Sequence, residues 1–339
     1  MLRIAVDRID ELFAKIAETQ GLYLPVDRKD GQAEFRKWSE GTKLSSALNT
    51  LRSAKDFFFP QTEKIVEFKK EGKNIEVVDI REDSEDFVIF GVRACDARSF
   101  KILDEVYLSD PVDTFYKNRR DHATVVTMAC TKPAETCFCH AYDIDFTEPG
   151  GDASCWSDGK FYYFKANSDK GEKLIDSLAA LLEDGDTAEL ENIKSKLKEV
   201  YEQLPLAKLS MENFGGDKMD EYFNSPKWAE LSEACLGCGT CTFICPTCQC
   251  FDIQDFDTGH GIKRYRCWDS CMYSEFTKTA GGQPRPSQLE RFRQRFMHKL
   301  VYFPANNDGE FGCVGCGRCL VKCPISMNIV KVMKALEAK

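Results

Sequence analysis

Residues 235–250 read CLGCGTCTFICPTCQC, so six of these sixteen residues are cysteines. The first four follow the spacing C-x2-C-x2-C-x3-C, and Pro246 comes directly after the fourth. The same spacing recurs from Cys313 to Cys323, and Pro324 follows. Two copies of one cysteine pattern in a single chain indicate two sites of the same kind.

This spacing is typical of the bacterial-type ferredoxin run, in which three close cysteines hold one [4Fe–4S] cluster and the fourth ligates the other cluster. The swap assigns four cysteines to the first cluster: Cys235, Cys238, Cys241 and Cys323. It assigns four others to the second cluster: Cys313, Cys316, Cys319 and Cys245. Two zinc knuckles fit less well, because zinc sites use paired C-x2-C units. We therefore expect two [4Fe–4S] clusters in a C-terminal, bacterial-type ferredoxin domain over residues 231–339.

The two runs are separated by an insertion, residues 246–312, which contains further cysteines. These are Cys248, Cys250, Cys267 and Cys271. Iron–sulfur clusters accept four-cysteine sets of varied spacing, so this set could hold a third cluster. The alternative is that some are free cysteines in the core, where cysteine behaves as a small apolar residue.

Four more cysteines lie in the first half of the chain, at or just after the ends of predicted strands: Cys95, Cys130, Cys137 and Cys139. The ends of neighbouring strands can converge, so a fourth cluster could form here, with His140 as a substitute ligand. Buried or reactive free cysteines are the alternative. Of the seventeen cysteines, these four sets leave only Cys155 unassigned.

The hydrophobic pattern divides the rest of the chain. Apolar runs such as FVIFGV (87–92) and ATVVTMAC (123–130) alternate with helical segments, which predicts an α/β domain over residues 1–165. An amphipathic helix is expected over residues 2–18. Residues 166–230 have helical periodicity and are expected to form a helical linker region.

Composition and missing motifs exclude several classes of protein. A net charge of −9 argues against nucleic-acid binding. No stretch approaches the roughly 20 apolar residues needed to span a bilayer, and the N-terminus lacks the zones of a signal peptide. We therefore expect a cytoplasmic protein with no membrane span. There is no G-x-G-x-x-G after a strand and no Walker lysine, so the sequence carries no nucleotide-binding fingerprint of its own.

The insertion is basic, with nine Lys or Arg against three Asp or Glu in residues 261–303. RFRQRFMHKL (291–300) is predicted to form a helix with one apolar side and one cationic side. The cationic side could be a solvated face, positive charge that eases cluster reduction, or a docking surface that includes Arg291, Arg293 and Arg295. Three donors near the cysteines could form hydrogen bonds to cluster sulfides: Arg264, Arg266 and Trp268.

Five motifs occur in one order along the chain: RACDARSF (93–100), CFC (137–139), CLGCGTCTFICPTCQC (235–250), RCWDSC (266–271) and CVGCGRCLVKCP (313–324). This combination resembles the [4Fe–4S] dicluster subunits typified by the beta subunit of soluble sulfhydrogenases and the corresponding iron–sulfur subunit of anaerobic sulfite reductase. CPTCQC followed by RCWDSC is the most specific part, and the likeness covers most of the chain. The chain departs from the family pattern at Ala94, where proline is expected, and at His140, where a small hydroxyl residue is expected.

The resemblance implies an iron–sulfur electron-transfer subunit of an anaerobic oxidoreductase complex, not itself a catalyst. One neighbour would be a ferredoxin-reductase-like subunit that binds FAD and NAD(P)H. The other would be a terminal redox subunit of hydrogenase, sulfite reductase or heterodisulfide reductase type. The alternative is a catalytic iron–sulfur enzyme that acts on a small disulfide or sulfur substrate through an open cluster site.

Overall fold

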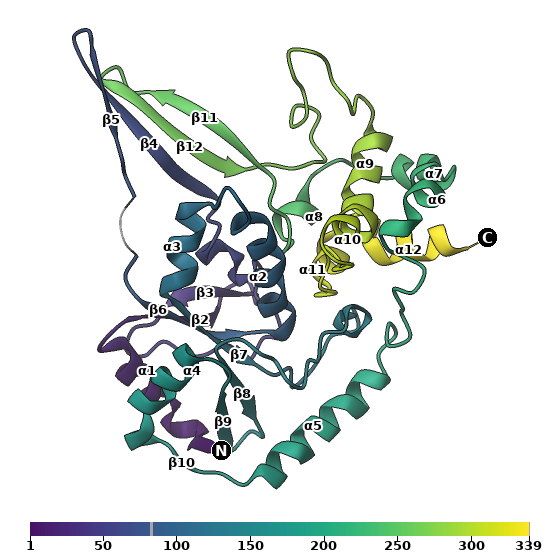
Figure 1. The fold of residues 1–339 in the computed structure, drawn as a ribbon. Helices are drawn as coiled ribbons and strands as arrows, with labels where there is room; N and C mark the ends of the chain where they lie inside the picture. Colours follow the sequence, from purple (N-terminus) through teal and green to yellow (C-terminus); the bar gives the residue numbers. More distant parts are fainter. Residues whose placement is uncertain (82–83, 339) are drawn as a thin grey trace.

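The computed structural model describes residues 1–81 and 84–338, and its largest element is an eight-stranded mixed sheet (Figure 1). The strand order is β10-β1-β9-β8-β7-β6-β2-β3, and β2, β6, β7 and β8 run parallel. The strands are β1 (Leu2–Ala5), β2 (Gly21–Asp27), β3 (Ala33–Lys37), β6 (Phe87–Val92), β7 (Ala123–Met128), β8 (Ala153–Ser157), β9 (Phe161–Ala166) and β10 (Glu183–Asp184). With its helices, this sheet forms the α/β body that the sequence predicted.

Helices cover both faces of the sheet, which explains the apolar runs of its central strands. β6 and β7 are buried along almost their whole length, as is typical of parallel strands with two covered faces. On one face, Phe13 packs against Phe90 with ring centroids 5.0 Å apart. On the other face, Phe100 and Tyr116 share a core with Ile89. The covering helices are α1 (Ile9–Ala17), α2 (Ala94–Tyr107), α3 (Thr114–His122) and α4 (Asp169–Ser177).

The N-terminal segment differs from the single helix expected over residues 2–18. Leu2–Ala5 form β1, which pairs antiparallel with β9, and α1 begins only at Ile9. Ile4 is fully buried in the sheet core. Strand pairing and burial therefore override the helical spacing of these first residues.

The α/β body also continues past residue 165, where the helical linker was expected to begin. α4 buries Leu174 and Ile175 in the sheet core, and β10 extends the sheet by pairing with β1. α5 (Thr187–Glu202) then leads from the body toward the C-terminal part (Figure 1). The first half of the predicted linker region, as far as Leu197 of α5, is therefore packed against the sheet.

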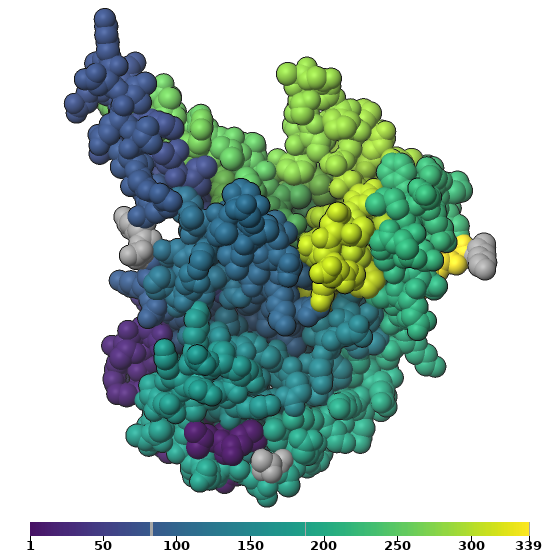
Figure 2. All heavy atoms as spheres, viewed as in Figure 1, coloured from purple at the N-terminus to yellow at the C-terminus, as the bar shows by residue number. Residues whose placement is uncertain are grey.

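A second sheet of four antiparallel strands joins segments that are far apart in the sequence. Its order is β11-β12-β4-β5. β4 (Thr62–Glu71) and β5 (Asn74–Val78) precede the central strands of the body, whereas β11 (Phe251–Asp257) and β12 (Gly261–Trp268) belong to the insertion. This sheet projects from the body as an arm (Figure 2). The insertion thus pairs with the N-terminal half of the chain.

The C-terminal part is helical and shares one apolar core with the α/β body. Trp228, Phe292 and Val332 pack in the same cluster as Cys137 and Phe138 of the body. The helices are α6 (Met219–Phe223), α7 (Lys227–Glu233), α8 (Thr240–Phe243), α9 (Gln288–Met297), α10 (Phe303–Asn306), α11 (Arg318–Lys322) and α12 (Ile329–Glu337), with a π-helical turn at His298–Tyr302. None of the helices in the described ranges has the length and hydropathy to cross a membrane.

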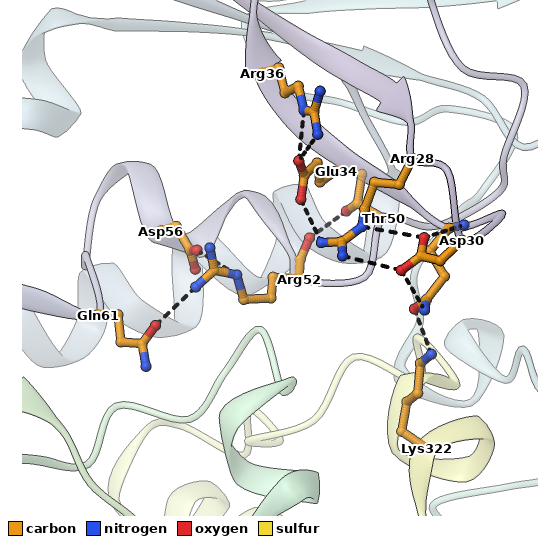
Figure 3. A network of polar contacts seen from close by, with 10 residues as sticks. Arg28, Asp30, Glu34, Arg36, Thr50, Arg52, Asp56, Gln61 and Lys322 are labelled. Carbon is orange, nitrogen blue, oxygen red and sulfur yellow. Dashed lines mark hydrogen bonds and ion pairs between the residues drawn. The ribbon is translucent and has the colours of Figure 1, made fainter.

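Polar contacts strengthen the junction between the two parts. The Lys322 ammonium of α11 donates to Gln32 Oε1 in the β2–β3 turn, at 2.6 Å. Lys322 lies there beside a network in which Arg28 binds Asp30 and Glu34 (Figure 3). The second cysteine run is therefore fixed against the body by its own helix.

Candidate functional site

The first cysteine run and the end of the second run line one cavity. Its wall contains all four cysteines expected at the first cluster: Cys235, Cys238, Cys241 and Cys323. The cavity is otherwise lined mainly by apolar side chains such as Met272, Phe292 and Phe296. The fold thus places the last cysteine of the second run beside the first three of the first run.

The second run lines another cavity. Its wall contains the four cysteines expected at the second cluster: Cys313, Cys316, Cys319 and Cys245. Phe138 of the CFC motif and three basic side chains, Arg295, Lys299 and Arg318, complete much of the lining. Arg295 lines both cavities, so the two spaces are neighbours on either side of one side chain.

Glycines let the two runs fold around these cavities. Gly237, Gly239, Gly315 and Gly317 have φ values of 65°, 72°, 59° and 76°, in the left-handed region that other residues rarely adopt. A Cβ on Gly315 would lie 2.4 Å from the Phe138 carbonyl oxygen. The second run therefore needs glycine both for its turn and for its contact with the α/β body.

In the described ranges, no group of three or more His, Cys, Asp or Glu side chains is arranged to hold a metal ion. A [4Fe–4S] cluster differs from such a site, because each of its four cysteines ligates a separate iron atom. The thiolates of a cluster site surround a space rather than meet at one point.

Buried cations beside the thiols fit an anionic cofactor. The exposed fractions of Arg295, Lys299 and Arg318 are only 3%, 4% and 5%, and a buried charge is costly unless it is compensated. Burial disfavours the charge on Lys299, yet nearby thiolates, led by Cys245, hold its pKa above the ordinary value. Four thiols per cavity with buried cations beside them are a donor set that suits [4Fe–4S] clusters.

The cluster chemistry also determines the protonation of the thiols. Burial raises the pKa of Cys319 to about 12, so this thiol is neutral at pH 7 when no metal is near. A coordinating thiol loses its proton to the metal's charge. Cluster assembly in the second cavity would therefore release protons.

Three of the insertion cysteines lie beside the second cavity. The Cys248 thiol is in hydrogen-bonding contact with Cys245, and the Cys250 thiol with Cys271. The contact with Cys271 lowers the pKa of Cys250 to about 7. Cys248 therefore lies next to a cysteine that was assigned to the second cluster, and the pair of Cys250 and Cys271 lies close to Cys248.

The fourth insertion cysteine, Cys267, has different surroundings. It lies in β12, opposite Asp252 of β11 and Thr62 of β4. Burial raises the pKa of its thiol, and the nearby carboxylates of Asp252 and Asp269 raise it further. Three cysteines of the expected third set are thus close together, whereas Cys267 lies near carboxylates.

The N-terminal cysteines converge at one edge of the large sheet. Cys95 opens α2 directly after β6, and the other three follow β7, so the carboxyl ends of two parallel strands bring them together. Cys130 and Cys137 lie close enough to influence the pKa of Cys139, and Cys139 in turn influences the pKa of Cys95. Cys95 is also under the influence of Cys316, which places this set next to the second cavity.

His140, the substitute ligand considered for this set, is engaged with Tyr201. Its Nδ1 lies 2.9 Å from the Tyr201 hydroxyl, and the same hydroxyl lies 3.4 Å from Cys139 Sγ. Burial raises the pKa of Cys139 to about 12, partly offset by the hydrogen bond with Tyr201. Tyr201 comes from α5, and nothing in the sequence pattern marked it as a neighbour of the cysteines.

The structure removes Arg295 from the docking surface that was considered on the basic helix, whereas Arg291 and Arg293 are half-buried. Arg295 is buried between the cavities and cannot face a partner. Lys299, one turn later on the same side, donates to Thr247 Oγ1 at 2.7 Å and to the Gly312 carbonyl at 2.8 Å. Arg295 and Lys299 therefore lie beside the cysteines, as in the alternative of charge beside the clusters.

The three donors expected near the cluster sulfides are committed elsewhere. Arg266 is buried in ion pairs with Glu63 and Asp113. Arg264 pairs with Asp255 at 2.7 Å, and Trp268 Nε1 donates to the carbonyl of a phenylalanine, Phe59, at 3.1 Å. These side chains stabilise the base of the arm instead of binding sulfides.

Two functional candidates were missed in the sequence. Lys55 is 2% exposed, donates to the Cys248 carbonyl at 2.9 Å and lies 3.6 Å from the centre of the Trp268 ring. Burial lowers the pKa of Lys55, against the opposing influence of nearby cysteines. Arg318 binds the Asp96 carboxylate through two nitrogens at 2.5 and 2.7 Å. Neither charged residue carries a sequence signal of burial.

Comparison with known proteins extends the likeness beyond the cysteine runs. A family model described as a 4Fe-4S dicluster domain matches residues 234–327. Sulfhydrogenase 2 subunit beta of Pyrococcus furiosus is 33% identical to this chain over 326 residues. That alignment covers 95% of this chain and 94% of the other protein. No solved structure shows a significant match.

Proposed function

Because the chain belongs to the family of the sulfhydrogenase beta subunits, we propose that it relays single electrons between two partner subunits. The chain is an iron–sulfur electron-transfer subunit, and the resemblance expected from its motifs is confirmed. The finer proposal is a donor subunit that binds FAD and NAD(P)H and a terminal redox subunit that consumes the electrons. The compartment that we propose is the cytoplasm.

One observation carries this proposal: two adjoining cavities are each lined by the four cysteines that the swap rule assigns to one cluster. A [4Fe–4S] cluster in each cavity would supply a one-electron redox centre. The chain's own residues would hold the iron through thiolates, keep water out with apolar side chains such as Phe138 and Phe296, and offset negative charge with buried cations.

The surroundings of the cavities suggest an order for the relay. The first cavity reaches the surface, because Cys238 is exposed and Leu236 is 66% exposed. The second lies between the first cavity and the N-terminal cysteines. We propose that electrons pass at the surface by way of the first cluster and move inward to the second.

Further clusters remain part of the proposal at two places. The N-terminal set of Cys95, Cys130, Cys137 and Cys139 would extend the relay from the second cavity into the α/β body. The insertion set would form a side site next to the second cavity, because Cys248 contacts Cys245 and Cys250 contacts Cys271. The count of clusters would then be two, three or four.

Metal analysis of the protein purified without oxygen tests the proposal. We expect a brown protein with acid-labile sulfide and ~8, ~12 or ~16 iron atoms per chain for two, three or four clusters. The identity of the subunits that co-purify would show the donor and acceptor. Protein that contains zinc or no metal, and no sulfide, would contradict the proposed function.

A second candidate is catalysis on a small disulfide or sulfur substrate at the N-terminal cysteines. The contact of Cys139 with Tyr201, and of Tyr201 with His140, favours it because such a chain could deliver a proton. Turnover of a small disulfide by the single chain, lost in Tyr201→Phe, would support this function. No turnover with a chemical electron donor would exclude it.

A further inference from the structure

Arg295 occupies a position that ligand counting does not predict. It lies on α9, is 3% exposed and lines both cysteine cavities. The thiols that influence its charge belong to both sets: Cys241 of the first, and Cys319 and Cys245 of the second.

The hydrogen bonds of Arg295 are incomplete. Its Nη2 donates to the Cys241 carbonyl at 3.3 Å. Its Nε and Nη1 are buried and have no hydrogen-bond partner within residues 1–81 and 84–338. Guanidinium donors are rigidly placed in a plane and need acceptors when they are buried. Two such donors without acceptors beside cysteine-lined spaces point to acceptors that the protein itself does not provide.

Lys299 is the informative contrast on the same helix. It is equally buried, but Thr247 and Gly312 accept hydrogen bonds from its ammonium. It also lines only the second cavity. Lys299 therefore contributes positive charge to the second cavity alone. Arg295, in contrast, has two N–H groups without acceptors and lies between the two cavities.

We propose that Arg295 donates hydrogen bonds to the inorganic sulfides of both clusters and thereby raises both reduction potentials together. This inference rests on the proposed function, because it requires clusters in the two cavities. Reduction adds one electron to a cluster and neither forms nor breaks a covalent bond. Hydrogen bonds to cluster sulfur and nearby positive charge favour the reduced, more negative state. A donor shared by two clusters would shift their potentials in the same direction.

Anoxic redox titration followed by EPR tests the proposal, with dithionite as the reductant. In Arg295→Gln we expect both midpoint potentials to fall by about 59 mV or more, which is a tenfold change for a one-electron couple. Arg295→Lys keeps the positive charge but loses the planar guanidinium donors. Both midpoint potentials should therefore fall by less than in Arg295→Gln. The matched control is Arg293→Gln on the same helix, whose guanidinium stacks on Phe223 3.8 Å away and should leave both midpoints unchanged.

A fall in only one midpoint would overturn the shared role, and unchanged midpoints in both Arg295 variants would overturn any role. A measurement on the unaltered chain covers the case in which the variants lose their clusters. With arginine labelled by ¹⁵N, pulsed EPR should detect a nitrogen coupling at both reduced clusters. The absence of this nitrogen coupling at the first or at the second reduced cluster would contradict the proposal. Iron-free protein would instead refute the proposed function, so the two failures are distinguishable.

Discussion

The two cysteine runs have the same spacing, but the protein packs them differently. The first cavity lies near the surface, where Leu236 is 66% exposed and Pro324 on the same wall is also exposed. The second cavity lies inside, and the corresponding residues, Val314 and Pro246, are buried. One ligand motif thus serves two environments, and the surrounding residues decide how accessible each site is.

The neighbours of the glycines show how this difference arises. A Cβ on Gly239 of the first run would meet the Tyr273 side chain, whereas one on Gly315 of the second would meet backbone atoms of Phe138 and Cys139. The Phe138 amide also donates to the Gly315 carbonyl at 3.0 Å. The second run is therefore held by the backbone of the α/β body, whereas Gly239 of the first run faces a side chain of the insertion.

The two runs also differ in charge at matched positions. The residue before the third cysteine is Thr240 in the first run and Arg318 in the second. Arg318 is buried with Asp96 from α2, so this position joins the second run to the body. We infer that the first site exchanges electrons at the surface, while the second is tuned from the interior.

The largest effect is expected from breaking the swap that connects the two sites. Cys245→Ser lies in the first run but should remove the second cluster, because its side chain lines the second cavity. It should therefore match Cys316→Ser, with a loss of about four iron atoms per chain, and leave the first cluster's EPR signal intact. Cys238→Ser is the control, which should remove the first cluster. A Cys245→Ser protein that resembles Cys238→Ser would disprove the ligand assignment.

The next largest effect is expected at the ion pair that only the second run has. Arg318→Leu would leave the Asp96 carboxylate 1% exposed and unpaired. Removing one partner of a buried pair destabilises a protein by about 3–5 kcal/mol. Urea unfolding under anoxic conditions, followed by tryptophan fluorescence, measures this loss. The matched Thr240→Leu in the first run should change stability by about 1 kcal/mol or less, and equal losses would refute the contrast.

The local parts of this comparison were predictable from the sequence. The repeated spacing gave the two cysteine sets, since ligand spacing is a property of a short segment. The apolar runs gave β6 and β7, because strands covered on both faces are apolar throughout. The resemblance and the matching family agree with these local signals.

The parts that depend on distant contacts were not predictable. β4 and β12 pair across nearly two hundred residues of sequence. Neither strand has a sequence pattern that indicates which other strand it pairs with. The burial of Arg295 and Arg318 has no local sequence signal, because charged side chains are rarely buried without partners. Their partners, thiolates and Asp96, come from other segments of the chain, so their burial depends on the tertiary fold.

A smaller effect is expected from the residues that follow the first cysteine of each run. Val314 is 2% exposed and packs in the core shared with the body. Val314→Ala should lower the free energy of unfolding by roughly 2 kcal/mol, because it leaves a gap in a packed core. The matched Leu236→Ala removes an exposed side chain and should stay within about 0.5 kcal/mol. Similar losses in the two variants would show that both runs are equally buried.

The smallest effect concerns access of small molecules to the two clusters. Attack on a cluster requires contact with its sulfur or its cysteine ligands, and only at the first site is such a ligand, Cys238, exposed. The second site is enclosed by Phe138 and Ile329, each 1% exposed. When an iron chelator is added to the oxidised protein without oxygen, the first cluster's signal should therefore decay several-fold faster than the second's. Leu236→Gly should accelerate only the decay of the first cluster's signal, because it uncovers the first site further. Equal decay rates would mean that local opening, and not the packing described above, controls access to both clusters.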